Sequence, residues 1–200
     1  MGYEVKKRSS FLELPPKGCY VAEIKGVRKK TPANDGVKRE YFEVYVEITD
    51  GEYKGRYNEV YEDQRERFGD SVQYKGMLRL VPPDKKIDGE KYDFMDRNFG
   101  GNLYCIQESN DGEFDWDKII KAGMTALKGK KVGINVRNRL YTYNGQDRQT
   151  TEICQFETVE DVLNGKVTPR KDRDQREKRE ESTDGSEFTD VSSNVDVPWA

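Results

Sequence analysis

The stretch from Lys130 to Phe156 alternates apolar and polar residues in two runs, which flank the tetrapeptide Tyr143-Asn144-Gly145-Gln146. Asn-Gly suits the two central positions of a type I′ turn, where both residues need a positive φ, so the stretch predicts a β-hairpin. Successive side chains of a strand point to opposite faces, and one face of the first run is apolar (Val132, Ile134, Val136 and Leu140). The other face is cationic and aromatic and carries Lys131, Arg137, Arg139, Tyr141 and Tyr143. We expect the apolar face to be buried and the other face to be exposed.

Three further strands are predicted before the hairpin. The first runs from Cys19 to Arg28 and leads into consecutive cations and a loop rich in Pro, Asn, Asp and Gly. The clearest alternation runs from Lys38 to Thr49, where the apolar face alternates with Tyr41, Glu43, Tyr45 and Glu47. The tyrosine-rich segment from Tyr53 to Tyr61 is predicted as the third strand, although Gly55 interrupts it.

Helical patterns are fewer. The periodicity is weak from Glu62 to Glu113, where only a short helix around Gly69 to Leu80 is indicated. Asp115 is a suitable N-cap for a helix from Trp116 to Leu127, whose apolar residues fall at helical spacing. A capped helical turn follows the hairpin, from Thr158 to Gly165.

The predicted order of strand, strand, strand, helix, strand and strand is that of an OB-fold, a small Greek-key barrel. We therefore expect a mainly β chain with an OB-fold-like five-stranded barrel, one or two helices and a disordered acidic C-terminal tail. Residues 1–169 form the predicted domain, with an extended insertion at about 62–113, and residues 170–200 form a charged linker and the tail.

Charge is divided unevenly along the chain. The 200 residues are 34% hydrophobic and 36% charged, which is too polar for the whole chain to pack around a core. Residues 182–200 contain four acids and no Lys or Arg, whereas residues 1–170 contain 30 basic and 29 acidic residues. The net charge of −3 therefore comes from the tail, whose composition predicts disorder.

Several function classes are made less probable by what the chain lacks. It has no histidine, the commonest general base and metal ligand, and its three cysteines have no CxxC spacing. We expect no metal site, no cofactor and no enzymatic activity. No apolar run reaches the roughly 20 residues that cross a bilayer, so a soluble cytoplasmic protein without membrane contact is expected.

The exposed faces predict single-stranded DNA binding. Proteins of this kind combine cations that follow the phosphates with flat rings on which unpaired bases stack, and an OB-fold presents such groups on its strands 2–3 and on its 1–2 and 4–5 loops. The candidate DNA-binding residues are Arg28, Lys29, Lys30, Lys38, Arg39, Tyr41, Tyr45, Lys131, Arg137, Arg139, Tyr141, Tyr143 and Arg148. The alternative is that such a face is rich in Lys, Arg and Tyr only to stay soluble.

Five strings, in this order and spacing, resemble one family: LPPKGCYVAEIKGV, FEVYVEITDGEYKGRY, IQESNDGEFDWD, LKGKKVGINVRNRLYTYNG and ETVEDVLNGKVTPR. They are similar to phage single-stranded DNA-binding proteins of Gram-positive hosts, which are encoded beside replication and recombination genes. The resemblance covers about residues 14–170. It implies an OB-fold, DNA binding in replication or recombination, and a place in the cytoplasm of the infected bacterial host. It brings no catalytic motif.

The last residues resemble a second group. Bacterial single-stranded DNA-binding proteins end in an acidic tail that closes on Asp-Ile-Pro-Phe, and this chain has Asp196, Val197, Pro198 and Trp199 before Ala200. The resemblance implies that these four residues recruit replication or recombination proteins. Ala200 moves the terminal carboxylate one residue away from the aromatic ring, so the docking of the tail is expected to differ.

Two other functions are compatible with the sequence. Glu23-x-Lys25 on a strand could belong to a nuclease metal site, but the upstream Pro-Asp partner is missing. A protein-interaction module, which engages a host or phage replication factor without binding DNA, is the stronger alternative. The sequence leaves open whether the chain also forms a homo-oligomer.

Overall fold

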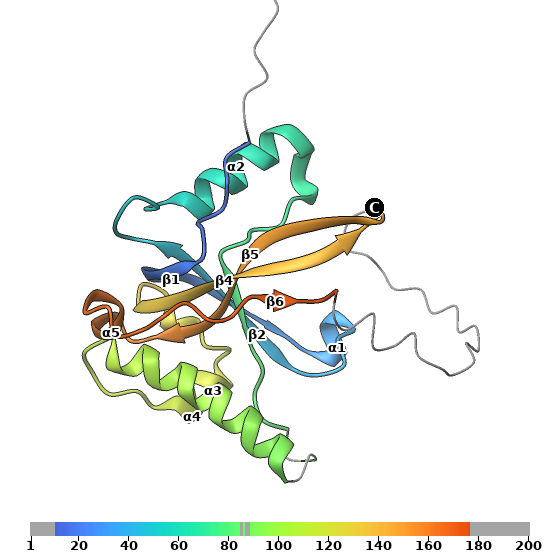
Figure 1. Ribbon diagram of the computed structural model, residues 1–200. Coiled ribbons are helices and arrows are strands. Elements are labelled where there is room, and N and C mark those ends of the chain that lie inside the picture. The colour runs from blue at the N-terminus through green and yellow to red at the C-terminus, as the bar shows by residue number, and fades with distance from the viewer. Residues whose placement is uncertain (1–10, 85, 87–88, 177–200) are drawn as a thin grey trace, which may run out of the picture.

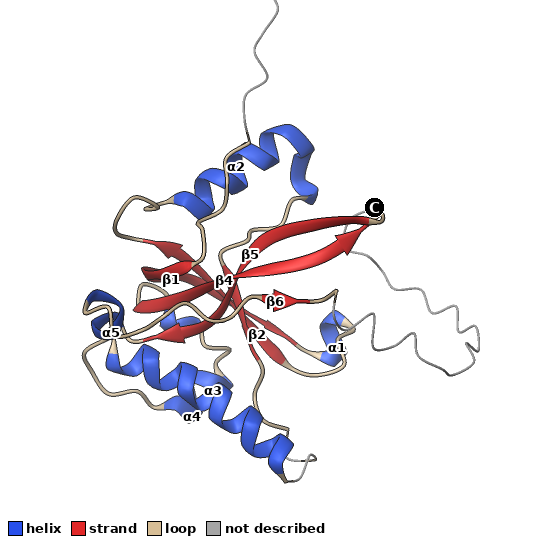
Figure 2. Ribbon diagram, viewed as in Figure 1, coloured by secondary structure: helices blue, strands red, loops and turns tan. Residues whose placement is uncertain are grey.

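A computed structural model describes residues 11–84, 86 and 89–176. The predicted tail, with the candidate partner-binding residues Asp196 to Trp199, lies outside the described residues. One mixed sheet forms the centre of the molecule, and its strands follow the order β3-β2-β1-β4-β5, with β6 beside β4 (Figures 1 and 2). The strands are β1 Gly18–Lys30, β2 Tyr41–Ile48, β3 Met77–Leu80, β4 Lys131–Tyr143, β5 Gln146–Glu157 and β6 Arg173–Asp174.

The strand order is OB-fold-like. The long strand β1 pairs with β4 through its first half and with β2 through its second half, and both pairings are antiparallel. β3 and β5 contact each other without a hydrogen-bonded ladder, so the sheet curls toward a barrel that is not closed. The prediction of a mainly β fold of this class is confirmed.

The core lies inside the curled sheet. Alternate residues of β1, β2 and β4 are fully buried there, together with side chains from α3 and from the turns before β4. The predicted apolar faces of the second strand and of the hairpin supply much of this core (Phe42, Val44, Val46, Ile48, Val132, Ile134 and Val136). Cys19, Cys105 and Cys154 are unpaired and half-buried.

Helices cover the ends of the barrel and occupy the connections. They are α1 Pro32–Asp35, α2 Arg56–Phe68, α3 Glu90–Glu108, α4 Trp116–Lys121 and α5 Val159–Leu163. Short 3₁₀ turns lie at Gly69–Ser71 and Thr125–Leu127. None of the helices in the described ranges is long and apolar enough to cross a membrane.

Several local predictions are confirmed. Asn144 and Gly145 have φ of 50° and 73°, as the type I′ turn between β4 and β5 requires. Asp115 caps α4, since its side chain accepts a hydrogen bond from the Lys118 amide, and Thr158 caps α5 in the same way. The predicted helix from Trp116 to Leu127 is split, because α4 ends at Lys121 and a 3₁₀ turn follows.

The third predicted strand is wrong. Residues 53–61 form a turn and the start of α2, because the Glu47 carboxylate accepts hydrogen bonds from the Tyr57 amide at 3.1 Å and the Asn58 amide at 2.6 Å. The carboxylate thus caps the first turn of the helix from outside it. The true third strand, β3, lies inside the segment where a short helix was expected, and the 19-residue helix α3 was missed.

Candidate nucleic-acid interface

The outer face of β1, β2 and β3 carries interleaved charged and aromatic side chains. Residues opposite each other in neighbouring strands point to the same side, and the register places Arg28, Glu43 and Arg79 in one row across the three strands. Lys30 and Tyr41 form the next row. The Arg79 guanidinium lies 5.0 Å from the centre of the Tyr41 ring, so cation and ring meet on the surface.

The loop between β1 and β2 is held by an ordered carboxylate. Thr31 caps the short helix α1, and Asp35 accepts hydrogen bonds from the Thr31 amide and from Lys30 Nζ, each at 3.1 Å. Arg28 lies 3.7 Å from the same carboxylate. The Thr31 amide, followed by Lys30, holds the pKa of Asp35 below its usual value, so this carboxylate is charged at neutral pH and neutralises part of the cationic loop.

The hairpin presents the face that the sequence predicts. The Arg139 guanidinium lies 5.7 Å from the centre of the Tyr141 ring, and that of Arg148 lies 5.1 Å from the centre of the Tyr143 ring. Tyr143 is 41% exposed at the hairpin tip. Arg137 is instead engaged with Glu152 on β5, at 2.7 Å. The exposed end of the hairpin thus repeats the pairing of ring and guanidinium found on β2 and β3.

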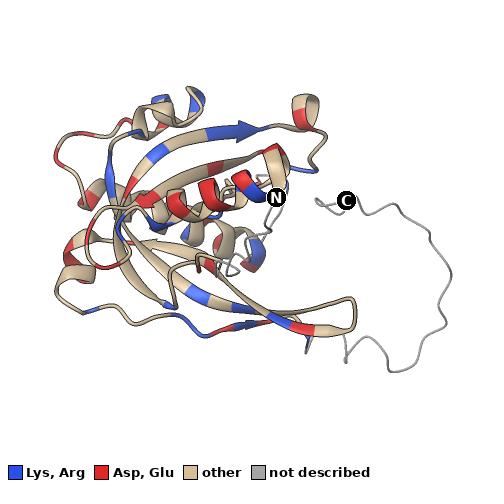
Figure 3. Ribbon diagram, turned by 90° about the horizontal axis from the view of Figure 1, so that it is seen from above, with Lys and Arg blue, Asp and Glu red and all other residues tan. Residues whose placement is uncertain are grey.

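The two cationic surfaces lie at the same end of the molecule. The hairpin tip and α1 project from one side, where β1 ends in a run of cations (Figures 1 and 3). β3 contacts β5 of the hairpin, and burial, followed by the charge of Arg139, lowers the pKa of Lys75 just before β3. β3 therefore lies beside the hairpin strand β5.

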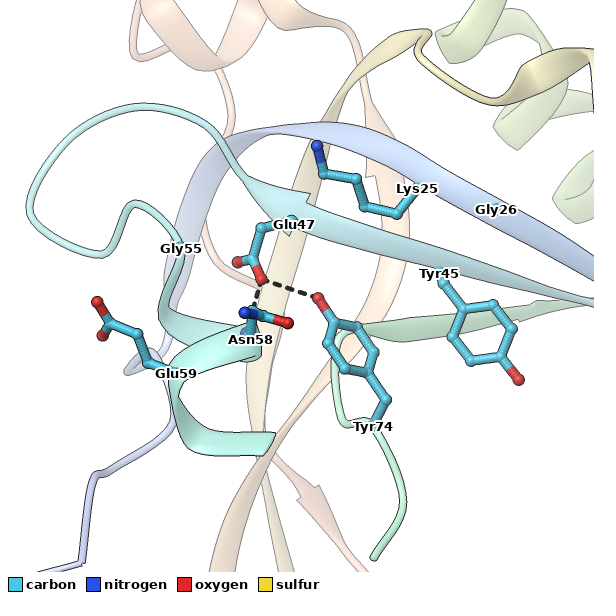
Figure 4. A pocket seen from close by; sticks show the side chains of 8 residues that line it. All are labelled: Lys25, Gly26, Tyr45, Glu47, Gly55, Asn58, Glu59 and Tyr74. Atoms are coloured by element: carbon cyan, nitrogen blue, oxygen red, sulfur yellow. Dashed lines mark hydrogen bonds between the residues drawn. The ribbon is translucent and has the colours of Figure 1, made fainter. Parts of the chain in front are cut away.

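A pocket of about 660 Å³ opens beside this surface, between β1, β2 and the start of α2 (Figure 4). Tyr45 and Tyr74 form its aromatic side, with ring centroids 6.2 Å apart, and Lys25 lies at its rim. Gly26, at the β-bulge of β1, is opposite Tyr45 and places no side chain beside the ring. The pocket can accept a flat apolar group against Tyr45.

Burial and hydrogen bonding keep the tyrosines of this pocket neutral. The Tyr45 hydroxyl donates to Glu43 at 2.8 Å, and burial followed by that carboxylate raises its pKa to about 12. The Tyr74 hydroxyl donates to Glu47 at 2.9 Å, and burial with the Glu47 charge raises the pKa of Tyr74 as well. The Tyr45 and Tyr74 rings therefore line the pocket in fixed positions and carry no charge at neutral pH.

Two of the predicted residues are not brought together with the others. The bulge at Lys25 reverses the alternation of β1, so Lys29 shares the side of Phe42 and pairs with Glu40 at 2.8 Å. Lys131 lies at the opposite end of β4 from the hairpin tip, beside Asn110. Gly133 and Asn135 lie on the same face of β4 as Lys131, and both are buried under α5 and the segment that follows it.

Other residues of this surface were missed from the sequence. Arg79, Lys75 and Tyr74 belong to it because β3 runs beside β2, whereas their segment had been interpreted as helical. The alternation in Met77-Leu78-Arg79-Leu80 is the only signal that could have identified a strand there, and four residues are too few to separate it from a helix. Lys38 and Arg39 lie exposed in the loop after α1, as expected.

The C-terminal segment of the described chain borders the hairpin. β6 pairs with β4 at Arg139 and Leu140, and Gln175 accepts a hydrogen bond from Arg139 at 3.0 Å. Arg176 donates to Asp147 near the hairpin tip at 2.6 Å, and this bond holds the pKa of Asp147 below its usual value. The chain thus continues beyond Pro169 in contact with the sheet. No group of three or more His, Cys, Asp and Glu side chains suited to a metal ion occurs in the described part.

Comparison with known proteins yields little. No protein family model matches the chain, and no curated protein matches it. One similar solved structure, "Yeast RPA bound to ssDNA", has 11% sequence identity and a TM-score of 0.27, and the match covers 80% of this chain and 89% of that one. An overlap this low carries no information about what this chain binds.

Proposed function

We propose that the protein binds single-stranded DNA without sequence preference and without catalysis. The observation that carries the proposal is the pairing of tyrosine rings with guanidinium groups on the outer faces of β2 and the hairpin, at the half-buried Tyr41 and Tyr141 and the exposed Tyr143. Unpaired bases stack on such rings while cations follow the phosphates, and neither interaction selects a base. In a duplex the base faces are already stacked, so duplex binding should be much weaker.

The test is fluorescence anisotropy of a labelled thymidine oligonucleotide, with a blunt duplex of the same length as the control. A labelled ligand is needed because Trp116 packs against Phe114 and lies in α4, far from the hairpin tip (Figure 1). If about four to six cations contact phosphates, log K should fall with log salt at a slope of roughly −3 to −4. Equal affinity for duplex, or no salt dependence, contradicts the proposal, and complete absence of DNA binding favours a protein-interaction module.

The biological setting follows from the resemblance of the sequence strings. We propose that the protein acts in phage DNA replication or recombination in the cytoplasm of an infected bacterium, and that its tail recruits partner proteins. Trp199 with Pro198 offers a compact apolar anchor beside the Asp196 carboxylate, and one desolvated aromatic ring can dominate a small interface. Trp199→Ala should abolish partner capture in pull-downs and leave DNA affinity unchanged. Capture of every partner by this variant would contradict recruitment by the tail.

A further inference from the structure

A second groove lies farther from the hairpin tip on the same face of β4, between α3 and the β4–β5 pair. We call this cavity of about 770 Å³ the α3 groove. Three segments that are distant in the sequence each contribute an arginine to it: Arg97 from α3, Arg137 from β4 and Arg170 from the chain after α5. Glu157 is the one acidic residue among its lining side chains.

Two of its three arginines, Arg97 and Arg170, are available to a ligand. Arg170 uses its backbone amide to bind Asn135, and its side chain forms no hydrogen bond or ion pair with the described residues. Arg97 donates one hydrogen bond, from Nε to the Asp93 carbonyl. Arg137, Arg170 and Cys154 all line the groove, and the charges of the two arginines oppose the rise in the pKa of the Cys154 thiol that burial causes.

The acidic residues near the groove are fewer than its arginines and already have hydrogen-bond or ion-pair partners. Glu157 accepts hydrogen bonds from Asn135 at 3.0 Å and from Gln155. Glu152 lies between Arg137, at 2.7 Å, and Arg173, at 3.7 Å, so two cations share one carboxylate. The α3 groove therefore carries a surplus of positive charge.

One face of α3 adds an aromatic ring and a stretch of uncovered backbone to the groove. Phe94, Arg97 and Gly101 are three and four residues apart and face the groove, and Phe94 is 63% exposed. A Cβ added at Gly101 would meet no protein atom within 4 Å, so packing does not require glycine there. Glycine inside a helix is less stabilising than alanine, and at this position it leaves the backbone open to close approach.

We infer that the α3 groove is a second subsite for single-stranded nucleic acid, which takes the phosphates and a base of the strand after it leaves the hairpin face. The inference rests on the proposed function. Arg137 joins the two surfaces, because it is two residues from Arg139 on the same face of β4. The strand would meet the same chemistry on both: guanidinium groups beside an exposed ring.

The first test compares a short and a long thymidine oligonucleotide, of about 8 and about 24 nucleotides, within the range of OB-fold site sizes and beyond it. Arg97→Ala/Arg170→Ala should leave affinity for the short ligand unchanged and remove most of the affinity gained with length. The salt slope for the long ligand should become shallower by about 1.4, from about 0.7 for each lost contact. Lys118→Ala/Lys121→Ala on α4 removes the same charge outside the groove and should change neither value.

The second test separates a ligand role from a structural one. Gly101→Ala should raise the melting temperature, because it stabilises α3, and should weaken binding of the long oligonucleotide severalfold. Gly100→Ala, whose added Cβ also meets nothing within 4 Å but does not face the groove, should raise the melting temperature alone. If both arginine and glycine variants bind the long ligand like the parent chain, the inference is wrong, while binding of the short ligand still supports the proposed function. Failure of the parent chain to bind either oligonucleotide would overturn both.

Discussion

Asp35 shows how a single carboxylate can restrain a cationic loop. It bonds Lys30 at 3.1 Å and lies 3.7 Å from Arg28, two residues predicted to contact phosphate. Asp35→Asn keeps the shape of the side chain and an acceptor for the Thr31 amide but removes the charge. We therefore expect tighter binding of single-stranded DNA and a steeper salt slope, measured by anisotropy in a salt titration. Unchanged affinity would place Arg28 and Lys30 outside the interface.

The pH dependence of this contact has a definite sign. The pKa of Asp35 is lower in the folded protein than its ordinary value of 3.8, so its stabilising contribution is present above that value and is lost as pH falls through the folded pKa. Between pH 5 and 8 the carboxylate stays charged. Asp35 should therefore add no pH dependence to DNA binding in that range, and the parent chain and Asp35→Asn should have parallel pH profiles.

At the scale of elements, the hairpin is where the proposed function is concentrated. Tyr141→Ala and Tyr143→Ala should each weaken single-strand binding by about 1–3 kcal/mol, the usual loss for one base–ring stack. Both rings lie on the outer face, so the melting temperature should change little. Circular dichroism melts measured beside the binding curves check this. Unfolding of either variant would mean that the ring supports the fold.

The hydrogen bonds that attach α2 to β2 lead to a prediction about stability instead of DNA binding. Glu47 is 8% exposed and accepts hydrogen bonds from the Ile48, Tyr57 and Asn58 amides and from the Tyr74 hydroxyl. Glu47→Ala removes the carboxylate that caps α2 at the Tyr57 and Asn58 amides, although the Tyr74 hydroxyl keeps the Val46 carbonyl as an acceptor at 2.9 Å. The variant should destabilise the protein by about 3 kcal/mol, as judged from hydrogen bonds to charged groups. Urea unfolding measures this loss. A variant as stable as the parent chain would show that water replaces the carboxylate.

Elements with long regular patterns were predictable from the sequence, and those set by tertiary contacts were not. The hairpin and β2 alternate over many residues and have clear turn signals, so their ends and faces were close to those observed. β3 has four residues, and α2 begins where the side chain of Glu47 from another element caps it. Neither the strand β3 nor the start of α2 can be recognised from the local periodicity of apolar residues.

The candidate site was predictable to the same extent. Alternation identified the outward-facing tyrosines of β2 and β4, but the bulge at Lys25 inverts the faces that follow it in β1 and places Lys29 on the core side. Gly26 beside the bulge was the only sequence signal for it. Arg79 and Lys75 joined the surface through the pairing of β3, which residue spacing could not show.

At the scale of the whole molecule, the end of the described chain connects the tail to the interface. Arg176 is bound to Asp147 near the hairpin tip at 2.6 Å, and β6 holds the preceding residues against β4. Arg176 is thus held beside the cations that we propose bind DNA, and only a short stretch of sequence separates it from the acidic segment 182–200. Its four carboxylates have no Lys or Arg among them, whereas residues 1–170 carry a net charge of +1 from 30 basic and 29 acidic residues.

Because of this tether, the tail should compete with DNA for the cationic face, over a distance of about 10 Å at 0.1 M salt. Removal of Ser182 to Ala200 should tighten binding of single-stranded DNA at low salt, and the difference should shrink as salt is added. A variant with Asp184, Glu187, Asp190 and Asp196 changed to Asn or Gln should bind as tightly as the truncated chain, since only charge is removed. Trp199→Ala should bind like the full chain, because its acids remain. A truncated chain that binds DNA no more tightly than the full one at low salt would show that the tail does not compete.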